Sequence, residues 1–292
     1  MLRITKSYNT IIRLKELSEN LRYLSAFNEK DAIEIERIDF VTPLSITPVS
    51  AIISEKQLLY KFGGETSSYL NVIQFPHGVG DLQNVDSGHT YIPIIHLSLE
   101  NLPPIERTTL LSQLHSLFLQ LLRENIIANE EFIHLITNNT FGFVMSEMLD
   151  NIEQHSHAKN VYLFAQYWAN QNACEVCLLD DGIGLLGSLQ QAGRDVYSHI
   201  EAVQKVIDLG LSAKTEHGEI IRGTGIKSTR RAITNHQIKG EFLLMSGNGA
   251  FLQTEAKKQF ITLQSAQWKG TIVMMKLHKP LELFDLYNYI AI

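Results

Sequence analysis

Two long helical patterns, followed by alternating strands and loops, constrain the fold of this chain most strongly. Residues 105–126 and 129–157 have the apolar spacing of helices, and the apolar segments NVYLFAQYW and ACEVCLLDD follow them as strands. A glycine-containing loop, the helical segment VYSHIEAVQKVIDL, a second glycine loop, a short helix and four closing strands come next. This succession predicts an α/β fold.

The first 104 residues carry a shorter alternation of helix and strand. A helical pattern covers residues 8–24, and the segments AIEIERI and YIPIIHL have the composition of strands. Two adjacent prolines in LENLPPIERTTL interrupt the pattern. We therefore expect a small α/β domain at residues 1–104 and a larger domain at residues 105–292.

The composition narrows the class of protein. The 292 residues are 45% hydrophobic and 19% charged, which is ordinary for a soluble globular chain. The net charge is −6 and no block of Lys and Arg could track a phosphate backbone, so we expect no nucleic-acid partner. The sequence shows no signal-peptide core and no run of about 18 apolar residues, so we expect no membrane segment and a cytoplasmic location.

Two cysteines, Cys174 and Cys177, have the spacing of a redox or metal pair. They lie in the strand-like segment ACEVCLLDD, where residues three apart point to opposite faces of a sheet. A zinc site would also need further Cys or His ligands nearby. We therefore expect two reduced thiols in the core.

Two glycine-rich loops each approach a known nucleotide motif. The loop DDGIGLLG contains GxGxxG, but its two acids would repel a pyrophosphate, and no strand ends in an acidic residue about 20 positions later. The loop HGEIIRGTGIKSTRR approaches a P-loop, but Ile226 stands where that motif has glycine and no apolar strand precedes it. We therefore expect neither a Rossmann nor a Walker A site.

A polar stripe on the second long helix complements these loops. Glu147, Asn151 and His155 are four residues apart, so their side chains share one helical face. Along the chain, four motifs follow one another: Glu147-x3-Asn151, Asp180-x-Gly182-x-Gly184, Gly223-Thr224-Gly225 and Gly270-Thr271. Their order and their placement resemble the GHKL ATPase family, which includes gyrase, Hsp90, MutL and the ATP-binding domains of histidine kinases. The resemblance covers residues 130–278 and implies a Bergerat-type α/β sandwich, a mixed sheet with helices on one face.

The resemblance implies a role for each motif. Asn151 would bind Mg²⁺, which takes only one or two protein oxygens besides water and phosphate. Glu147 would orient or deprotonate the attacking water or hydroxyl. Asp180 would accept a hydrogen bond from the exocyclic amine of adenine, and a water would link Thr271 to the same base edge. The glycines two and four residues after Asp180 would let the backbone approach the nucleotide.

The second glycine loop opens a helix, whose first N–H groups favour an anionic phosphate. Gly223, Thr224 and Gly225 would contact the nucleotide in this way. Lys227 replaces the third glycine of the commonest family pattern. This lysine would either contact the phosphates or face the solvent.

The family's ATP lid would correspond to residues 185–222. Lys214 and Arg222 would then contact the phosphates, or else be solvated surface charges. The spacing ExxxNxxxH is closest to anti-sigma-factor serine kinases and related stand-alone proteins, in which the residue at the position of His155 borders the pocket. A packed or solvent-facing histidine explains His155 equally well and explains His157 better.

Two further segments carry weaker signals. IDFVTPLSITPVSAII, SSYLNVIQF and YIPIIHLS together look like the STAS-like domains that accompany some bacterial GHKL proteins. Ser45 and Ser50 stand near the turn at which such domains are phosphorylated, but neither matches well. His115, in the first long helix, faintly resembles the phosphoacceptor of a histidine kinase, although Ser116 stands where an acid usually follows.

These observations predict a Mg-ATP-binding regulatory protein with a GHKL-type pocket formed by motifs between residues 147 and 271. Glu147 favours slow ATP hydrolysis or protein serine/threonine phosphorylation. Without a visible substrate-reading element, a non-catalytic, nucleotide-gated protein-interaction module stays open, and a histidine-kinase-like protein is less well supported. The expected cofactors are ATP and Mg²⁺, the expected partner is an unidentified regulatory protein, and a homodimer is a possible assembly.

Overall fold

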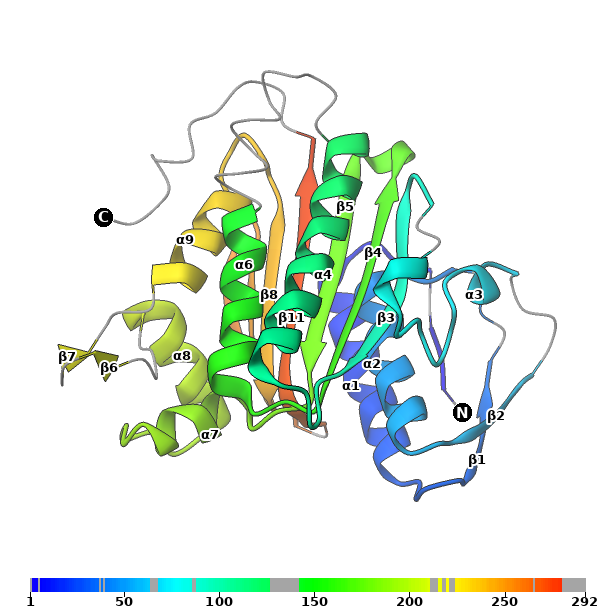
Figure 1. Ribbon diagram of the computed structural model, residues 1–292, viewed down its shortest axis with the longest axis horizontal. Helices are drawn as coiled ribbons and strands as arrows, with labels where there is room; N and C mark the ends of the chain where they lie inside the picture. Colours follow the sequence, from blue (N-terminus) through cyan, green and yellow to red (C-terminus); the bar gives the residue numbers. More distant parts are fainter. Residues whose placement is uncertain are drawn as a thin grey trace.

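A seven-stranded sheet forms the centre of the molecule (Figure 1). Its strand order is β10-β9-β8-β11-β5-β4-β3. The computed structural model describes residues 2–4, 6–36, 38, 40–63, 68–85, 88–126, 142–210, 215–216, 219–220, 224–264 and 266–279. The strands of this sheet are β3 (Tyr91–Ser98), β4 (Asn160–Trp168), β5 (Ala173–Asp180), β8 (Glu241–Gly247), β9 (Gly249–Gln253), β10 (Lys258–Thr262) and β11 (Trp268–His278).

Every neighbouring pair of strands in this sheet is antiparallel. Short connections join β4 to β5, β8 to β9 and β9 to β10, and a hairpin gives antiparallel neighbours. β11 lies between β5 and β8 and is antiparallel to both. The predicted α/β fold is confirmed, whereas the expected mixture of pairings is not found in this sheet. Parallel pairing occurs between β1 (Ala32–Ile35) and β2 (Leu59–Phe62), which form a separate two-stranded sheet.

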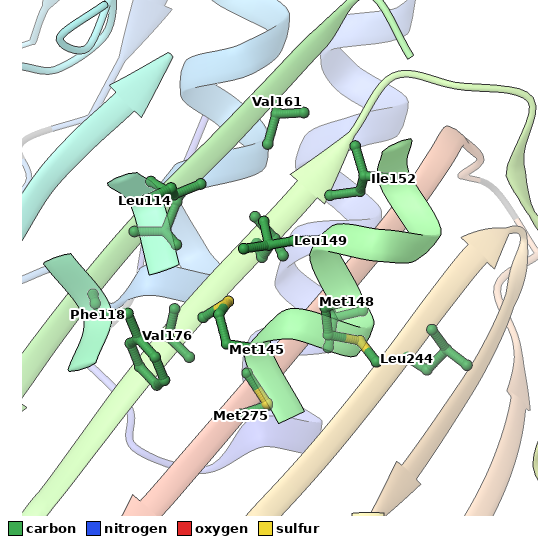
Figure 2. Close-up of a cluster of buried hydrophobic side chains, with 14 of the residues drawn as sticks. Leu114, Phe118, Met145, Met148, Leu149, Ile152, Val161, Val176, Leu244 and Met275 are labelled. Atoms are coloured by element: carbon green, nitrogen blue, oxygen red, sulfur yellow. The ribbon is translucent and has the colours of Figure 1, made fainter. Parts of the chain in front are cut away.

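Among the described residues, five helices that begin at or after residue 104 cover one face of the sheet (Figure 1). They are α4 (Pro104–Asn125), α6 (Gly142–Asn151), α7 (Gly184–Gln191), α8 (His199–Leu209) and α9 (Thr224–Ile233). α6 continues into a π-helical turn, η3 (Ile152–Ser156). One apolar core fills the space between these helices and the sheet (Figure 2), and it includes Leu114, Phe118, Met145, Leu149, Val176 and Met275. The described helices that follow residue 104 thus lie on one face, as predicted.

Residues before the predicted boundary supply the layer on the opposite face. This layer contains α1 (Thr10–Ser25) and α2 (Pro43–Glu55), and a second core joins it to the sheet. Cys174 belongs to the first core and Cys177 to the second, as the alternation along a strand predicts. Both thiols are free and fully buried, and burial raises the pKa of each. The short elements are α3 (Tyr69–Val72), η1 (Leu82–Asn84), η4 (Ala169–Gln171), β6 (Thr215–Glu216) and β7 (Glu219–Ile220).

A buried ion pair fixes α1 and α2 to the sheet. Arg13 of α1 and Glu175 of β5 are each 1% exposed, and Arg13 Nη1 lies 2.6 and 2.7 Å from the two carboxylate oxygens. Glu175 also accepts the N–H of Leu44, in the first turn of α2, at 3.1 Å. β3 precedes the predicted boundary and pairs with β4 as the edge strand of the same sheet. The sheet therefore continues across the boundary, and the STAS-like character of residues 1–104 stays a prediction.

None of the helices in the part of the chain that the structure describes combines the length and the hydrophobicity that crossing a bilayer requires.

Candidate functional site

Asp180 ends strand β5, next to the central strand β11, and is 4% exposed. Its Oδ1 accepts the N–H of Gly182 at 2.8 Å. Thr271, which lies opposite Asp180 on the neighbouring strand β11, donates its backbone N–H to the same carboxylate. Burial is the main cause that raises the pKa of Asp180 to about 7; the charge of Asp181 acts in the same direction and the two N–H donors oppose it. The end of β5 therefore carries a buried acceptor that titrates near neutral pH.

Glycines pack closely around this carboxylate. A Cβ atom on Gly182 would overlap with the carbonyl of Ser156, and one on Gly270 would overlap with the carbonyl of Asp180. Gly184 begins α7 with a φ of +68°, in the left-handed region that glycine adopts most readily. At Gly182 and Gly270 any other residue would force a shift of the surrounding backbone, and at Gly184 it would adopt an unfavourable φ and clash with the Ser246 side chain.

Ser246 of β8 and Trp268 of β11 hold the loop in place. The hydroxyl of Ser246 accepts the N–H of Leu185 at 2.9 Å and donates to the carbonyl of Gly270 at 3.0 Å. Trp268 Nε1 donates to the carbonyl of Asp180 at 2.7 Å. Neither residue is predicted from the sequence, because a lone serine or tryptophan in a strand pattern does not show which loop it will contact.

Helix α6, which carries the polar stripe, ends against the same loop. Glu147 and Asn151 lie one turn apart on α6, and both side chains are half-buried. The π-helical turn that follows Asn151 ends at Ser156, whose carbonyl accepts the N–H of Ile183 at 2.8 Å. Turns of this type are frequent at functional sites. The structure thus brings the end of the polar helix into contact with the loop after Asp180.

The start of α9 is the third predicted part of the site. Thr224 and Gly225 are the first residues of α9, so the second glycine loop does lead into a helix, and the half-buried Lys227 follows within the first turn. α9 packs against α6 in the same layer. Other predicted positions lie outside the described residues: Lys214, Arg222 and Gly223, together with the side chains of His155 and Thr224.

The second acid of the loop, Asp181, has a different role. Its Oδ1 accepts the N–H groups of Lys159 and Asn160 at 2.8 and 2.9 Å, and its Oδ2 accepts from Asn160 Nδ2 at 2.9 Å. Asp181 therefore fixes the first residue of β4 to the end of β5. His157, just before this strand, is exposed and has a left-handed φ of 50°.

A groove of about 700 Å³ also runs along α4, away from these residues. Its wall combines apolar residues such as Leu82, Ile105 and Leu117 with uncharged polar residues, and none of the predicted nucleotide contacts is among its lining residues. His115 belongs to α4 but does not line the groove. The groove is therefore separate from the Asp180 site.

Comparison of the chain with models of known protein families finds no match, and comparison with curated proteins finds none either.

Proposed function

We propose that the protein binds ATP through Asp180 and acts as a regulatory protein of the GHKL type. The observation that carries this proposal is the buried Asp180 carboxylate. Within the described residues no salt bridge includes it. The N–H groups of Gly182 and Thr271 leave further lone pairs of the carboxylate available. Strongly perturbed acids of this kind are concentrated at functional sites.

The chemistry of the acceptor supports adenine rather than guanine. The exocyclic amine of adenine donates a hydrogen bond, whereas guanine has a carbonyl oxygen in that position and would meet the Asp180 carboxylate as a second acceptor. Gly182 and Gly270 let the backbone pack directly around Asp180, because the carbonyl groups of Ser156 and Asp180 occupy the space where their Cβ atoms would lie.

The residues on α6 fit the needs of Mg²⁺. The ion keeps most of its water and takes one or two protein oxygens, so the amide oxygen of Asn151 together with phosphate oxygens is a suitable set. Within the described residues no group of three or more His, Cys, Asp and Glu side chains could hold a metal, so this site would depend on the nucleotide. Bound there, Mg²⁺ would neutralise charge on the phosphates. Glu147, one turn earlier, would take the proton of the attacking water or hydroxyl.

Titration of nucleotide and measurement of phosphate release separate binding from chemistry. Asn151→Ala should bind ATP without a dependence on Mg²⁺. Glu147→Gln should bind ATP as the parent does and lose about 10²- to 10⁴-fold in turnover. Glu153→Gln is a matched control, because the Glu153 carboxylate is bound by Thr108 Oγ1 at 2.5 Å.

The outcomes distinguish the classes of function. A parent that binds ATP and releases or transfers no phosphate would be a nucleotide-gated interaction module. Parental turnover in Glu147→Gln would exclude Glu147 as the base. A parent without measurable ATP binding would overturn the proposal.

A further inference from the structure

A buried arginine on α9 joins three elements around the proposed site. Arg230 is 7% exposed. Its Nη1 donates to Gln253 Oε1 on β9 at 2.8 Å, and its Nη2 donates to the carbonyl of Ile207 on α8 at 3.2 Å. The guanidinium also lies over the ring of Phe251, 5.9 Å from the ring centroid. One side chain therefore ties α9 to both α8 and β9.

A closed set of hydrogen bonds fixes this arginine. Gln253 Nε2 donates to Thr234 Oγ1 at 2.6 Å, and Thr234 Oγ1 donates to the backbone carbonyl of Arg230 at 2.7 Å. Arg230, Thr234 and Gln253 are all buried, so water competes little for these bonds. Loss of the guanidinium would leave the Gln253 oxygen without its donor.

The contact with Ile207 lies at the end of α8. The last four carbonyls of a helix have no partner in a following turn, and a positive charge near them is favourable. α8 ends at Leu209, and Gly210 closes it in the left-handed conformation. Arg230 thus supplies a donor to one of these carbonyls from the neighbouring helix.

The contacts of Arg230 fix the position of α9 more than they stabilise the fold. Burial is the main cause that lowers the pKa of Arg230; the charge of Arg231 acts in the same direction and that of Asp208 opposes it. Within the described residues no salt bridge compensates the buried charge. Arg230 lies six residues after Thr224, about 9 Å along the helix from its start. Its effect is therefore to fix where α9, and with it the first turn, lies.

We propose that Arg230 is a positioning residue for phosphate binding. It holds the last turn of α9 against α8 and β9 and so fixes the direction of the helix, which lets the N–H groups of the first turn meet the nucleotide phosphates. Arg230 acts through α9 and not through contact with the nucleotide. The inference rests on the proposed ATP-binding function. Arg230 would therefore affect binding of the phosphates and not binding of the base, because the base would be bound by Asp180 on β5.

Arg230→Met and Arg230→Lys test this inference. Methionine keeps the apolar stem and removes every donor, whereas lysine keeps the charge without the planar fork that serves two acceptors. Arg230→Met should weaken ATP binding about tenfold, the effect of losing one interaction of hydrogen-bond size. Arg230→Lys should show a smaller loss. The affinity for adenosine should stay within about twofold of the parent in both variants.

Arg231→Met is the matched control, because Arg231 is exposed on the same helix. It should leave the affinities for both ATP and adenosine as in the parent. Equal losses for ATP and adenosine in the Arg230 variants would overturn the inference, since they would indicate general destabilisation. Parental ATP affinity in either folded Arg230 variant would overturn it as well.

Hydrogen exchange without nucleotide tests the positioning separately. Both Arg230 variants should raise exchange in the last turn of α8 and the first turns of α9, whereas Arg231→Met should not. Unchanged exchange in the Arg230 variants would overturn the inference even if the parent binds ATP. A parent that binds neither ATP nor adenosine would instead overturn the proposed function, and the exchange data would still decide whether Arg230 positions α9.

Discussion

Asp180→Asn should remove a pH dependence that the buried carboxylate gives to the stability of the fold. The pKa of this aspartate rises from 3.8 to about 7 on folding. Between these values the folded state holds a proton that the unfolded state has lost, so the free energy of unfolding falls as the pH rises. About three pKa units at roughly 1.36 kcal/mol each give a loss of about 4 kcal/mol. Above about pH 7 the loss is complete and the curve levels off.

Asparagine cannot ionise, so the variant escapes this loss. Its free energy of unfolding relative to the parent should rise by about 4 kcal/mol between about pH 4 and about pH 8. Urea unfolding followed by tryptophan fluorescence at several pH values measures the difference. Asp208→Asn, which removes an exposed carboxylate on α8, controls for the change in net charge. Parallel pH profiles for the parent and Asp180→Asn would refute the reasoning, because they would show that folding does not desolvate the carboxylate.

The ATP affinity of the parent should fall as the pH drops below about 7, because a protonated Asp180 is a weaker acceptor than the carboxylate. Calorimetric titrations at two pH values would show this, and a flat profile would argue against contact with the base. Gly184→Ala should lower the free energy of unfolding by about 1–3 kcal/mol, through a left-handed φ and a clash with a side chain. Gly193→Ala shares the positive φ but has open space around it, so an equal loss there would exclude the clash. Arg13→Met should cost about 3–5 kcal/mol, because it leaves the Glu175 charge buried without its partner. The double variant with Glu175→Leu should recover most of this loss in urea unfolding, and a double variant no more stable than Arg13→Met would contradict the account.

Periodicity in the sequence predicted α4 and the strands after residue 159 closely, but α7 was expected to be part of a loop, and residues 129–141 of the second helical pattern lie outside the described residues. The helical pattern at residues 105–126 is found as α4, Pro104–Asn125, and the apolar runs after residue 159 are found as strands. These signals are local, since the side chains of one element alternate between core and solvent within a few residues.

The assembly of layers could not be predicted in this way. Arg13 and Glu175 are 162 positions apart, and nothing near either residue shows that they will pair. The same holds for β3, whose pairing with β4 joins the first part of the chain to the sheet. Ser246 contacts the loop after Asp180 only because β11 lies between β8 and β5. Contacts of this kind depend on the topology of the sheet, which short sequence patterns do not encode.

Selectivity for adenine is the most direct test of the central claim, that Asp180 forms the base-binding part of a nucleotide site. Isothermal titration of the full chain with ATP and with GTP, each in the presence of Mg²⁺, compares the two bases under the same conditions. Asp181→Asn would serve as the control, because its carboxylate is bound to the start of β4. We predict saturable binding of ATP, much weaker binding of GTP, and loss of the difference in Asp180→Asn but not in Asp181→Asn. Equal affinity of the parent for ATP and GTP, or no binding of either, would contradict the account.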